Sequence, residues 1–496
     1  MFITALTAIA VSCGKQESYL IDQRGVEVTA QENREYSYTD KKAGYWYGTT
    51  HQEELQWYSG WNMAKKRVLA DYTISVDGRV LDRSEAECIV YPDRLVRRWD
   101  NTIETFRMLD NLPIIYIEIK TEEPTSAITL DKTLIADEYT VEGHTFYIPG
   151  EAPDMRIMVA SDGAKGFVLT YGTEDECRAL HAEFMKNGQK LIKERRDRIN
   201  SLITEYNPVK TNLPELDKAL DWITITMDEL ITCQQGNGIY AGLPWFNEYW
   251  GRDMFISMPG ACLVTGQFDI AKEILKDFVK LQDTDPESET YGRIPNRANL
   301  EGILYNTTDG TPRLVIQAYQ LAQYSGDTEF LHELYPAIKM SIDASIKNYT
   351  DEKGYLTHAD ADTWMDVKRN GIPGSPRGNR ANDIQALWYE QLTAGSHIAA
   401  LMGDDSSAEE WSGLAQMLAA NFESDYCDKD GAFIYDHLNA DGSKDTQFRP
   451  NQVYCFDLIA DDEFKQKVTR RVWEELVYPW GVASLAQWDP QFHPQH

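Results

Sequence analysis

Positive charge is scarce in this sequence. The 496 residues include 48 Lys and Arg against 79 Asp and Glu, which gives a formal net charge of −31 at pH 7. Because a nucleic-acid-binding surface needs basic residues to meet the phosphates, this balance excludes a nucleic-acid partner. A neutral, hydroxyl-rich ligand fits such an acidic chain better than an anionic one.

Cysteine motifs and long apolar runs are also missing. The seven cysteines form no CxxC pair and share no metal-ligand spacing with the nine histidines, so the sequence predicts no disulfide framework, metal or cofactor. DKDG at 428–431 resembles the start of a calcium loop, but the later ligands are absent and we interpret it as a turn. After the N-terminus, no segment approaches the roughly 18 apolar residues of a spanning helix.

The N-terminus is a short apolar segment, MFITALTAIAVSC, that is too short to span a membrane as a helix. AVSC resembles a bacterial lipobox, in which the cysteine, here Cys13, becomes the lipidated first residue of the mature protein. We therefore expect a lipoprotein-type signal and tether over 1–18 and a periplasmic or surface location in a bacterial envelope. Membrane contact would come only through this lipid. The alternative is a frayed apolar N-terminus on a cytoplasmic protein.

Strand patterns dominate residues 19–173. Runs rich in β-branched and aromatic residues are separated by turn residues, and they predict an N-terminal β-sandwich domain. Examples are YTISVDGRVL (72–81), LPIIYIEIKT (112–121) and GFVLTYGT (166–173). From 174 to 207 the apolar residues recur at helical spacing, so we expect a linker helix there.

Helical patterns alternate with loops over 208–496. Several of these patterns are apolar on more than one face, as expected for helices that pack on both sides. Long loops that carry Trp, Asp, Arg and Gly alternate with short ones, and such loops are where sites are usually built. The pattern predicts an all-α toroid with a site at one mouth. The expected helices lie near 213–233, 253–265, 268–283, 312–325, 328–350, 382–402, 407–426, 449–460 and 462–476.

A cluster of aromatic residues precedes an Arg-Asp pair in AGLPWFNEYWGRDMFISMPG (241–260). Trp245 and Trp250 are two of these aromatic residues, and the pair is Arg252 and Asp253. An Asp in the first turn of a helix often interacts only with the helix dipole. Rings for the C–H faces of a sugar and a charged pair for its hydroxyls nevertheless favour a pyranose pocket.

Two further stretches carry polar residues at the start of predicted helices. IPNRANLEGILYNTTDGTPRL (294–314) contains Asn306 and Asp309, and Asp309 could be no more than a helix cap. HADADTWMDVKRNGIPGSPRGN (358–379) is rich in turn residues, which is also typical of a surface loop. Against a plain surface loop, a tryptophan and a methionine lie in the middle of this polar run.

Glycoside hydrolysis needs two carboxyl groups across the scissile bond, and one of them donates a proton. A donor that is protonated near neutral pH should be partly desolvated by apolar neighbours. Asp366 follows Trp364 and Met365 and has that local setting. Asp360 and Asp362 are bracketed by alanines and do not have it.

Taken together, the motifs resemble the amylo-alpha-1,6-glucosidase (glycogen debranching) family of inverting glycoside hydrolases. The residues that carry the resemblance are PWFNEYWGRDMFISMPG, IPNR…YNTTDGT, TWMDVKRNGIPGSPR and DIQALWY, in the order of the family and over most of 240–460. The resemblance implies an (α/α)6 toroid that removes α-1,6-linked glucose from the branch points of glycogen or limit dextrin. Maltooligosaccharides would be related ligands, and no cofactor is implied.

The resemblance also implies a role for each matching residue. Asp366 would be the general acid. Arg252 and Asp253 would hold the hydroxyls of the glucose, and Trp245 and Trp250 would be walls of the pocket. The other implied pocket residues are Asn306, Asp309 and Trp364, with Arg377 ordering the loop after the acid and Asp383 standing where the family usually has Glu.

The catalytic base of the family, a glutamate, has no counterpart in these 496 residues. The resemblance therefore implies a toroid that is incomplete at its C-terminus, and the missing base puts the activity of this chain in doubt. Two alternatives stay open. One is another α-glucosidase of helical-toroid type, similar to glucoamylase or trehalase, and the other is a non-catalytic surface protein that binds α-glucans.

Overall fold

The computed structural model describes residues 19–52, 56–122, 128–133, 140–142, 145–149, 154–207, 209–299 and 301–494. The predicted lipidation site Cys13 lies outside them. The chain forms two compact units, one of residues 1–40 and 44–226 and the other of residues 41–43 and 227–496. Among the described helices, none combines the length and the apolar character needed to cross a membrane.

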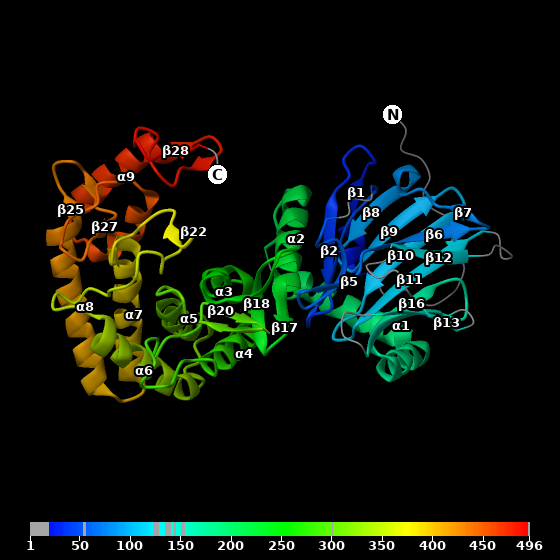
Figure 1. Ribbon diagram of the computed structural model, residues 1–496, viewed down its shortest axis with the longest axis horizontal. Helices are drawn as coiled ribbons and strands as arrows, with labels where there is room; N and C mark the ends of the chain where they lie inside the picture. Colours follow the sequence, from blue (N-terminus) through cyan, green and yellow to red (C-terminus); the bar gives the residue numbers. More distant parts are fainter. Residues whose placement is uncertain are drawn as a thin grey trace. The chain divides into compact units, whose positions relative to one another are not determined.

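The first unit contains a β-sandwich of antiparallel strands (Figure 1). Its largest sheet has the order β1-β8-β9-β10-β11-β16-β15-β14-β13, and two smaller sheets have the orders β2-β3-β4-β5 and β12-β6-β7. The strands are β1 (Val26–Val28), β2 (Glu35–Thr39), β3 (Gly44–Thr49), β4 (Gly60–Met63), β5 (Lys66–Leu69), β6 (Asp71–Val76), β7 (Arg79–Val80), β8 (Glu87–Tyr91), β9 (Arg94–Trp99), β10 (Thr102–Met108), β11 (Ile114–Thr121), β12 (Ile128–Thr133), β13 (Thr140–Glu142), β14 (Thr145–Pro149), β15 (Met155–Ser161) and β16 (Phe167–Thr173).

Aromatic side chains from all three sheets form the core of the sandwich. The ring of Phe106 on β10 lies 5.1 Å from the ring of Trp46 on β3 and stacks at 6.1 Å on Tyr72 of β6. All three side chains are buried. Because each aromatic ring buries a large apolar area, these contacts hold the sheets together face to face.

Helix α1 (Glu174–Thr204) packs on the largest sheet of the first unit. It begins with a capping box in which Thr173 and Glu176 exchange hydrogen bonds with each other's backbone. Ten residues into the helix, Phe184 packs against Tyr116 of β11 with ring centroids 4.7 Å apart. The long apolar stripe that the sequence shows over 174–207 is therefore used for packing. Helix α2 (Pro214–Leu230) follows.

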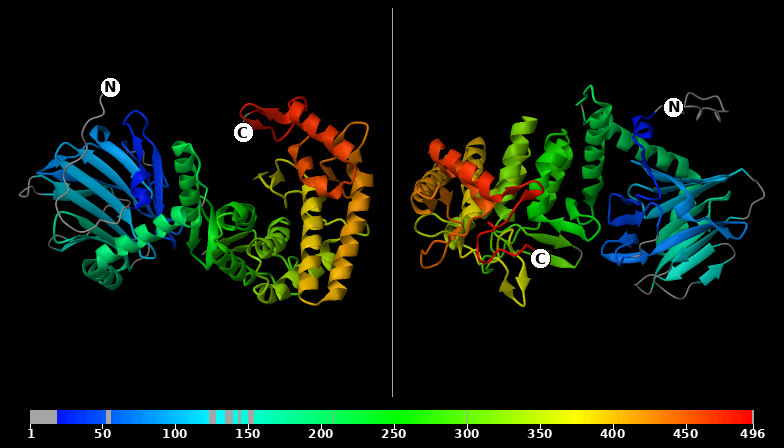
Figure 2. Two further views of the ribbon diagram at one scale, coloured as in Figure 1. Left: turned by 180° about the vertical axis from the view of Figure 1, so that it is seen from behind. Right: turned by 90° about the horizontal axis from the view of Figure 1, so that it is seen from above.

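The second unit is built mainly from helices, and α7 packs against both α8 and α5. Helices α7 and α8 are the two long neighbouring helices in yellow and orange in the left view of Figure 2. Each of the remaining expected helical regions contains a helix, although the one expected near 449–460 is a 3-10 helix. The helices are α3 (Gly251–Met258), which continues into the π-helix η3 (Pro259–Leu263), α4 (Phe268–Val279), α5 (Gly310–Ser325), α6 (Leu331–Tyr349), α7 (Asn382–Leu401), α8 (Asp405–Tyr426), the 3-10 helix η4 (Pro450–Leu458) and α9 (Asp462–Leu476).

Short strands interrupt the helices, so the expectation of an all-α unit is wrong in this detail. A sheet with the order β17-β18-β19-β20-β21 precedes and follows α3, and four two-stranded pairs occur later. Apart from β18 and β19, these strands have only two or three residues, which is too few for a period of two to appear in the sequence. They are β17 (Ile231–Cys233), β18 (Asn237–Gly242), β19 (Phe246–Trp250), β20 (Arg297–Asn299), β21 (Gly302–Leu304), β22 (Lys368–Arg369), β23 (Ile372–Pro373), β24 (Arg380–Ala381), β25 (Cys427–Asp428), β26 (Phe433–Ile434), β27 (His437–Leu438), β28 (Val477–Tyr478) and β29 (Gly481–Val482).

Candidate active site

The Arg-Asp pair opens α3 directly after strand β19. Trp250 ends the strand, and the amide of Gly251 donates to the carbonyl of Asn296 at 2.6 Å. A Cβ on Gly251 would lie 2.5 Å from the carbonyl oxygen of Pro295, so the close approach of these two segments requires glycine. This backbone contact fixes the position from which Arg252 extends.

The guanidinium of Arg252 joins acceptors from two separate loops. Its Nε donates to the carboxylate of Asp309, and its terminal nitrogens donate to Asp366 Oδ2 at 3.1 Å and to the carbonyl of Thr363 at 3.0 Å. Burial opposes the charge of Arg252, but the two carboxylates raise its pKa above the ordinary value. Arg252 is therefore a fixed cation that holds the loop of Asp366 beside α3.

Asp309 precedes α5 in the N-cap position but makes no capping hydrogen bond. Its side chain instead binds Arg252, and the residue is only 2% exposed. The structure thus excludes the capping alternative for Asp309.

A cavity opens between α3, α5 and α7. Its volume of about 590 Å³ is typical of a site for a small molecule. Four residues that the sequence predicts for the pocket line it, namely Arg252, Asp253, Trp364 and Asp383. The other lining residues are Ile256, Pro259, Arg313, Ile316, Gln317, Gln320, Ala386, Leu387, Glu390 and Tyr454.

Several polar residues of the cavity are not singled out by the sequence analysis, namely Gln317, Gln320, Glu390 and Tyr454. Arg313 and Gln317 lie one turn apart on α5, and Glu390 lies two turns after Asp383 on α7. Burial raises the pKa of Glu390, and the charge of Asp457 adds to this while Arg313 opposes it. Arg313 and Gln317 are four residues apart, and Asp383 and Glu390 are seven residues apart. Such spacings place the two residues of each pair on the same face of a helix, which is the signal in the sequence that could have identified Gln317 and Glu390.

Burial raises the pKa of two carboxyl groups that the sequence analysis does not propose as the proton donor, those of Asp253 and Asp362. The side chain of Asp366 is 27% exposed and contacts Arg252. Burial raises the pKa of Asp362, with the charge of Arg293 opposing it, although the local sequence around Asp362 is not apolar. Burial likewise raises the pKa of Asp253, and Arg252 opposes it.

Some buried polar atoms without a hydrogen-bond partner belong to residues that line the cavity or contact Arg252. Arg313 Nε and Gln317 Oε1 belong to cavity-lining residues, and Asp309 Oδ1 belongs to the partner of Arg252. Each such atom costs about 1–3 kcal/mol if nothing satisfies it. A ligand with several hydroxyl groups can satisfy many of them at once. Three further buried atoms of the described chain, in the stretch 294–314, also have no hydrogen-bond partner, namely Asn296 Oδ1, Thr307 Oγ1 and Thr308 Oγ1.

The remaining predicted pocket residues lie in different settings. Trp364 lines the cavity and is 41% exposed. Trp245 is half-exposed, and the ring of Trp250 faces the guanidinium of Arg297 at 5.8 Å. Asn306 accepts a hydrogen bond from a neighbouring asparagine side chain. Six predicted site residues are not among the cavity-lining residues, so their contact with a sugar stays a prediction: Trp245, Trp250, Asn306, Asp309, Asp366 and Arg377.

Arg377 links the loop of Asp366 to α7. It is fully buried, its Nε donates to Asp436 Oδ2 at 2.6 Å, and a terminal nitrogen donates to Asp383 Oδ1 at 2.7 Å. Burial alone would lower the pKa of Arg377, but Asp383 and Asp436 raise it. The expected role of Arg377 in ordering this loop is consistent with these contacts, and Asp436 is a partner that the sequence did not predict.

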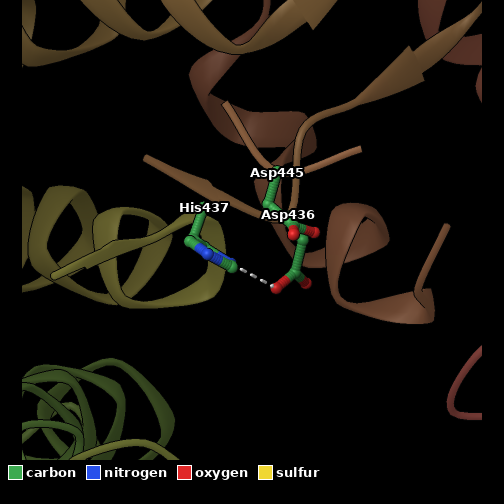
Figure 3. Close-up of side chains that lie close together, drawn as sticks. All are labelled: Asp436, His437 and Asp445. Carbon is green, nitrogen blue, oxygen red and sulfur yellow. Dashed lines mark hydrogen bonds and ion pairs between the residues drawn. The ribbon is translucent and has the colours of Figure 1, made fainter. Parts of the chain in front are cut away.

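Three possible metal ligands lie close together, namely Asp436, His437 and Asp445 (Figure 3). Asp436 is also the partner of Arg377. The carboxylate of Asp436 already accepts from Arg377, from His437 at 3.1 Å and from Asn451 at 3.0 Å. Burial opposes its charge, yet Arg377 and His437 lower its pKa to about 2. Because a buried guanidinium occupies the carboxylate, this donor set favours an ion-pair cluster over a cation site.

His358, at the start of the loop of Asp366, is a buried histidine whose ring makes two hydrogen bonds to the backbone. Its Nε2 accepts from the amide of Ala381 at 2.8 Å, its Nδ1 donates to the carbonyl of Ala359 at 2.9 Å, and burial lowers its pKa to about 4. Between pH 6.5 and 4 the unfolded chain binds a proton that the native state does not, so the free energy of unfolding falls as the pH falls through this window. We expect a loss of about 3 kcal/mol, measured by urea denaturation at a series of pH values.

A His358→Gln variant lacks this titration, so its stability difference from wild type should shrink as the pH falls from 6.5 to 4. The exposed His332, changed to Gln, is the matched control. A difference between wild type and His358→Gln that is the same at every pH would refute the assignment.

Comparisons with known proteins bear on the family and the fold of the chain. A family model described as amylo-alpha-1,6-glucosidase matches residues 218–496. A bacterial glucoamylase solved in complex with acarbose is similar in structure, with 13% identity and a TM-score of 0.57 over 95% of this chain and 82% of that chain. A GH78 family rhamnosidase of Bacillus sp. GL1 matches with 14% identity and a TM-score of 0.40 over 54% of this chain and 26% of that chain. No curated protein matches.

At 13% identity the likeness to the glucoamylase concerns the fold, which combines a β-sandwich-like region with a helical toroid part. Fold and family match together define a glycoside hydrolase. The chain belongs to the amylo-alpha-1,6-glucosidase family, because the family model covers more than half of it. The resemblance that the motifs indicate is therefore confirmed.

Proposed function

We propose that the chain removes α-1,6-linked glucose from branch points of glycogen or limit dextrin, with inversion and with Asp366 as the general acid. The main support for a sugar site is the contact of Arg252, which lines the cavity, with both Asp309 and Asp366. The acid role of Asp366 rests on the family motif TWMD at 363–366. The family match and the acarbose complex of the structural neighbour support an α-glucan as the ligand.

In this mechanism the sugar hydroxyls satisfy the buried polar atoms around Arg252, and the exposed face of Trp364 packs against the pyranose ring. Asp366 gives its proton to the glycosidic oxygen while the bond from that oxygen to C1 breaks. Water adds to C1 from the opposite face, and its proton goes to a second carboxylate about 6.5–9.5 Å from the first. We assign this second role to no described residue.

The linkage and the stereochemistry are tested together. We expect glucose release from a phosphorylase limit dextrin and from isomaltose-type linkages to exceed release from maltose-type linkages and from trehalose. Because one displacement inverts the anomeric carbon, the first product seen by proton NMR should be β-glucose. Release of α-glucose first would contradict the inverting mechanism.

A glucoamylase-like activity is the second candidate, since the structural neighbour is a glucoamylase. It predicts that maltose-type linkages are the preferred substrates in the same panel. A non-catalytic α-glucan-binding role predicts instead that calorimetry detects maltooligosaccharide binding while every hydrolysis assay is negative.

We also propose that residues 1–18 are a lipoprotein signal and tether and that Cys13 carries the lipid, on the basis of the AVSC motif alone. Metabolic labelling with a radioactive fatty acid checks this proposal. Equal labelling of wild type and a Cys13→Ser variant would refute it.

A further inference from the structure

The carboxylate of Asp436 lies at the centre of a buried hydrogen-bond network behind the cavity. Asp436 precedes β27 and is only 1% exposed. Its Oδ2 accepts from Arg377 at 2.6 Å and from His437 at 3.1 Å, and its Oδ1 accepts from Asn451 at 3.0 Å. Arg449 lies at the edge of the network, with its Nε 4.0 Å from the same carboxylate.

Two branches of this network end at cavity-lining residues. In the first branch, the Nδ2 of Asn451 donates to Asp436 while its Oδ1 accepts the indole N–H of Trp364 at 3.1 Å. In the second branch, Arg377 donates to Asp436 and also to Asp383 at 2.7 Å. Asp436 itself does not line the cavity. Any influence of Asp436 on a ligand therefore passes through Trp364 or Asp383.

The donors and acceptors of the first branch determine which way the side-chain amide of Asn451 is turned. An ionised carboxylate can only accept hydrogen bonds, and an indole N–H can only donate. Asn451, which is 1% exposed, must therefore turn its amide nitrogen towards Asp436 and its oxygen towards Trp364. If Asp436 could donate, the Asn451 amide could turn over and would then present a nitrogen to the indole N–H.

We propose that Asp436 is a positioning residue that sets the orientation of Trp364 through Asn451 and that of Asp383 through Arg377. The residue shapes the cavity wall without touching a ligand. Its kinetic consequence rests on the proposed function, because Trp364 and Asp383 belong to the proposed sugar site. The orientation of Trp364 does not rest on it and can be measured in the absence of any substrate.

The kinetic test is a double-mutant cycle between Asn451→Ala and Trp364→Phe, which keeps an aromatic ring but removes the indole N–H. We expect each single variant to lower kcat/KM by roughly 10-fold to 100-fold, because a displaced wall misplaces the sugar. In the Trp364→Phe background, Asn451→Ala should cause no further loss. Trp473→Phe, at an exposed tryptophan on α9, is the matched control and should leave kcat/KM unchanged.

The structural test uses the chain labelled with 5-fluorotryptophan and its fluorine NMR spectrum. The signal that disappears in Trp364→Phe belongs to Trp364, and the signal that disappears in Trp473→Phe belongs to Trp473. We expect Asn451→Ala and Asp436→Asn to shift or broaden the Trp364 signal and to leave the Trp473 signal in place.

The outcomes separate the two proposals. If wild type hydrolyses no glucan, the proposed function fails, and the fluorine spectra still decide the role of Asp436. If Asp436→Asn does not fold, Asp436→Glu, which keeps the charge but displaces the carboxylate, replaces it in the fluorine spectra. An unmoved Trp364 signal in the folded variants, or equal kcat/KM losses for Asn451→Ala in both backgrounds, would overturn the inference.

Discussion

An Asp366→Asn variant is expected to release glucose from limit dextrin roughly 10²–10⁴-fold more slowly than wild type, with little change in KM. The amide keeps the size of the side chain and an oxygen that can accept from Arg252, so the wall of the site should be preserved. What the variant lacks is the proton that the leaving sugar oxygen needs as its bond to C1 breaks. Steady-state rates at the pH optimum of wild type measure the loss.

A substrate with a better leaving group distinguishes a proton donor from a merely structural residue. Fluoride departs from α-glucosyl fluoride without protonation by an acid, so the loss on this substrate should be much smaller than the loss on limit dextrin. Asp360→Asn in the same loop is the matched control, because Asp360 is exposed and makes no recorded contact with Arg252. Near wild-type release of glucose from limit dextrin by Asp366→Asn would contradict the acid role.

An Arg252→Met variant is expected to lose about 3–5 kcal/mol of the unfolding free energy of the helical unit and most of its affinity for maltooligosaccharides. Methionine preserves much of the apolar stem but leaves the carboxylate of Asp309 without its cation. Asp309 is 2% exposed, so water cannot readily replace the guanidinium. Urea denaturation followed by circular dichroism at 222 nm gives the stability, and calorimetry gives the affinity.

A second substitution shows whether the unpaired charge is the cause. Asp309→Asn removes that charge, so the double variant Arg252→Met/Asp309→Asn should recover more than half of the stability that Arg252→Met loses. Arg470→Met, at an exposed arginine on α9, should change neither stability nor affinity. A loss below about 1 kcal/mol for Arg252→Met would show that the pair is no more stabilising than a surface ion pair.

Local sequence predicts the elements whose signals are local. The turn at Asp77 and Gly78 follows from the DG dipeptide, since both residues have the positive φ that few other residue pairs adopt readily. The strands β11 and β16 lie within the runs at 112–121 and 166–173. Strands β17, β20 and β21 escaped detection because each has only three residues, and the pairing of β19 with β20 joins segments that lie before and after α3.

In the candidate site, too, the sequence predicts single residues but not the contacts between distant segments. The sequence predicts Arg252, Asp309 and Asp366 individually, but not that one guanidinium joins the two carboxylates. Burial raises the pKa of Glu390, and most of its neighbours in the run ALWYEQL (386–392) are apolar, so the local criterion used for Asp366 also fits Glu390. The double ion pair of Arg252, by contrast, arises only where separate helices and loops meet.

The three contacts of Arg252 bear on the order in which helices and the candidate site form during refolding. The acceptors lie 57, 111 and 114 residues further along the sequence. Helices form from neighbouring residues in microseconds, whereas contacts between distant segments form only after the intervening chain has closed into a loop. A refolding chain therefore regains its helical signal before the guanidinium reaches both carboxylates, and the competence to bind a sugar arrives as one of the last events of folding.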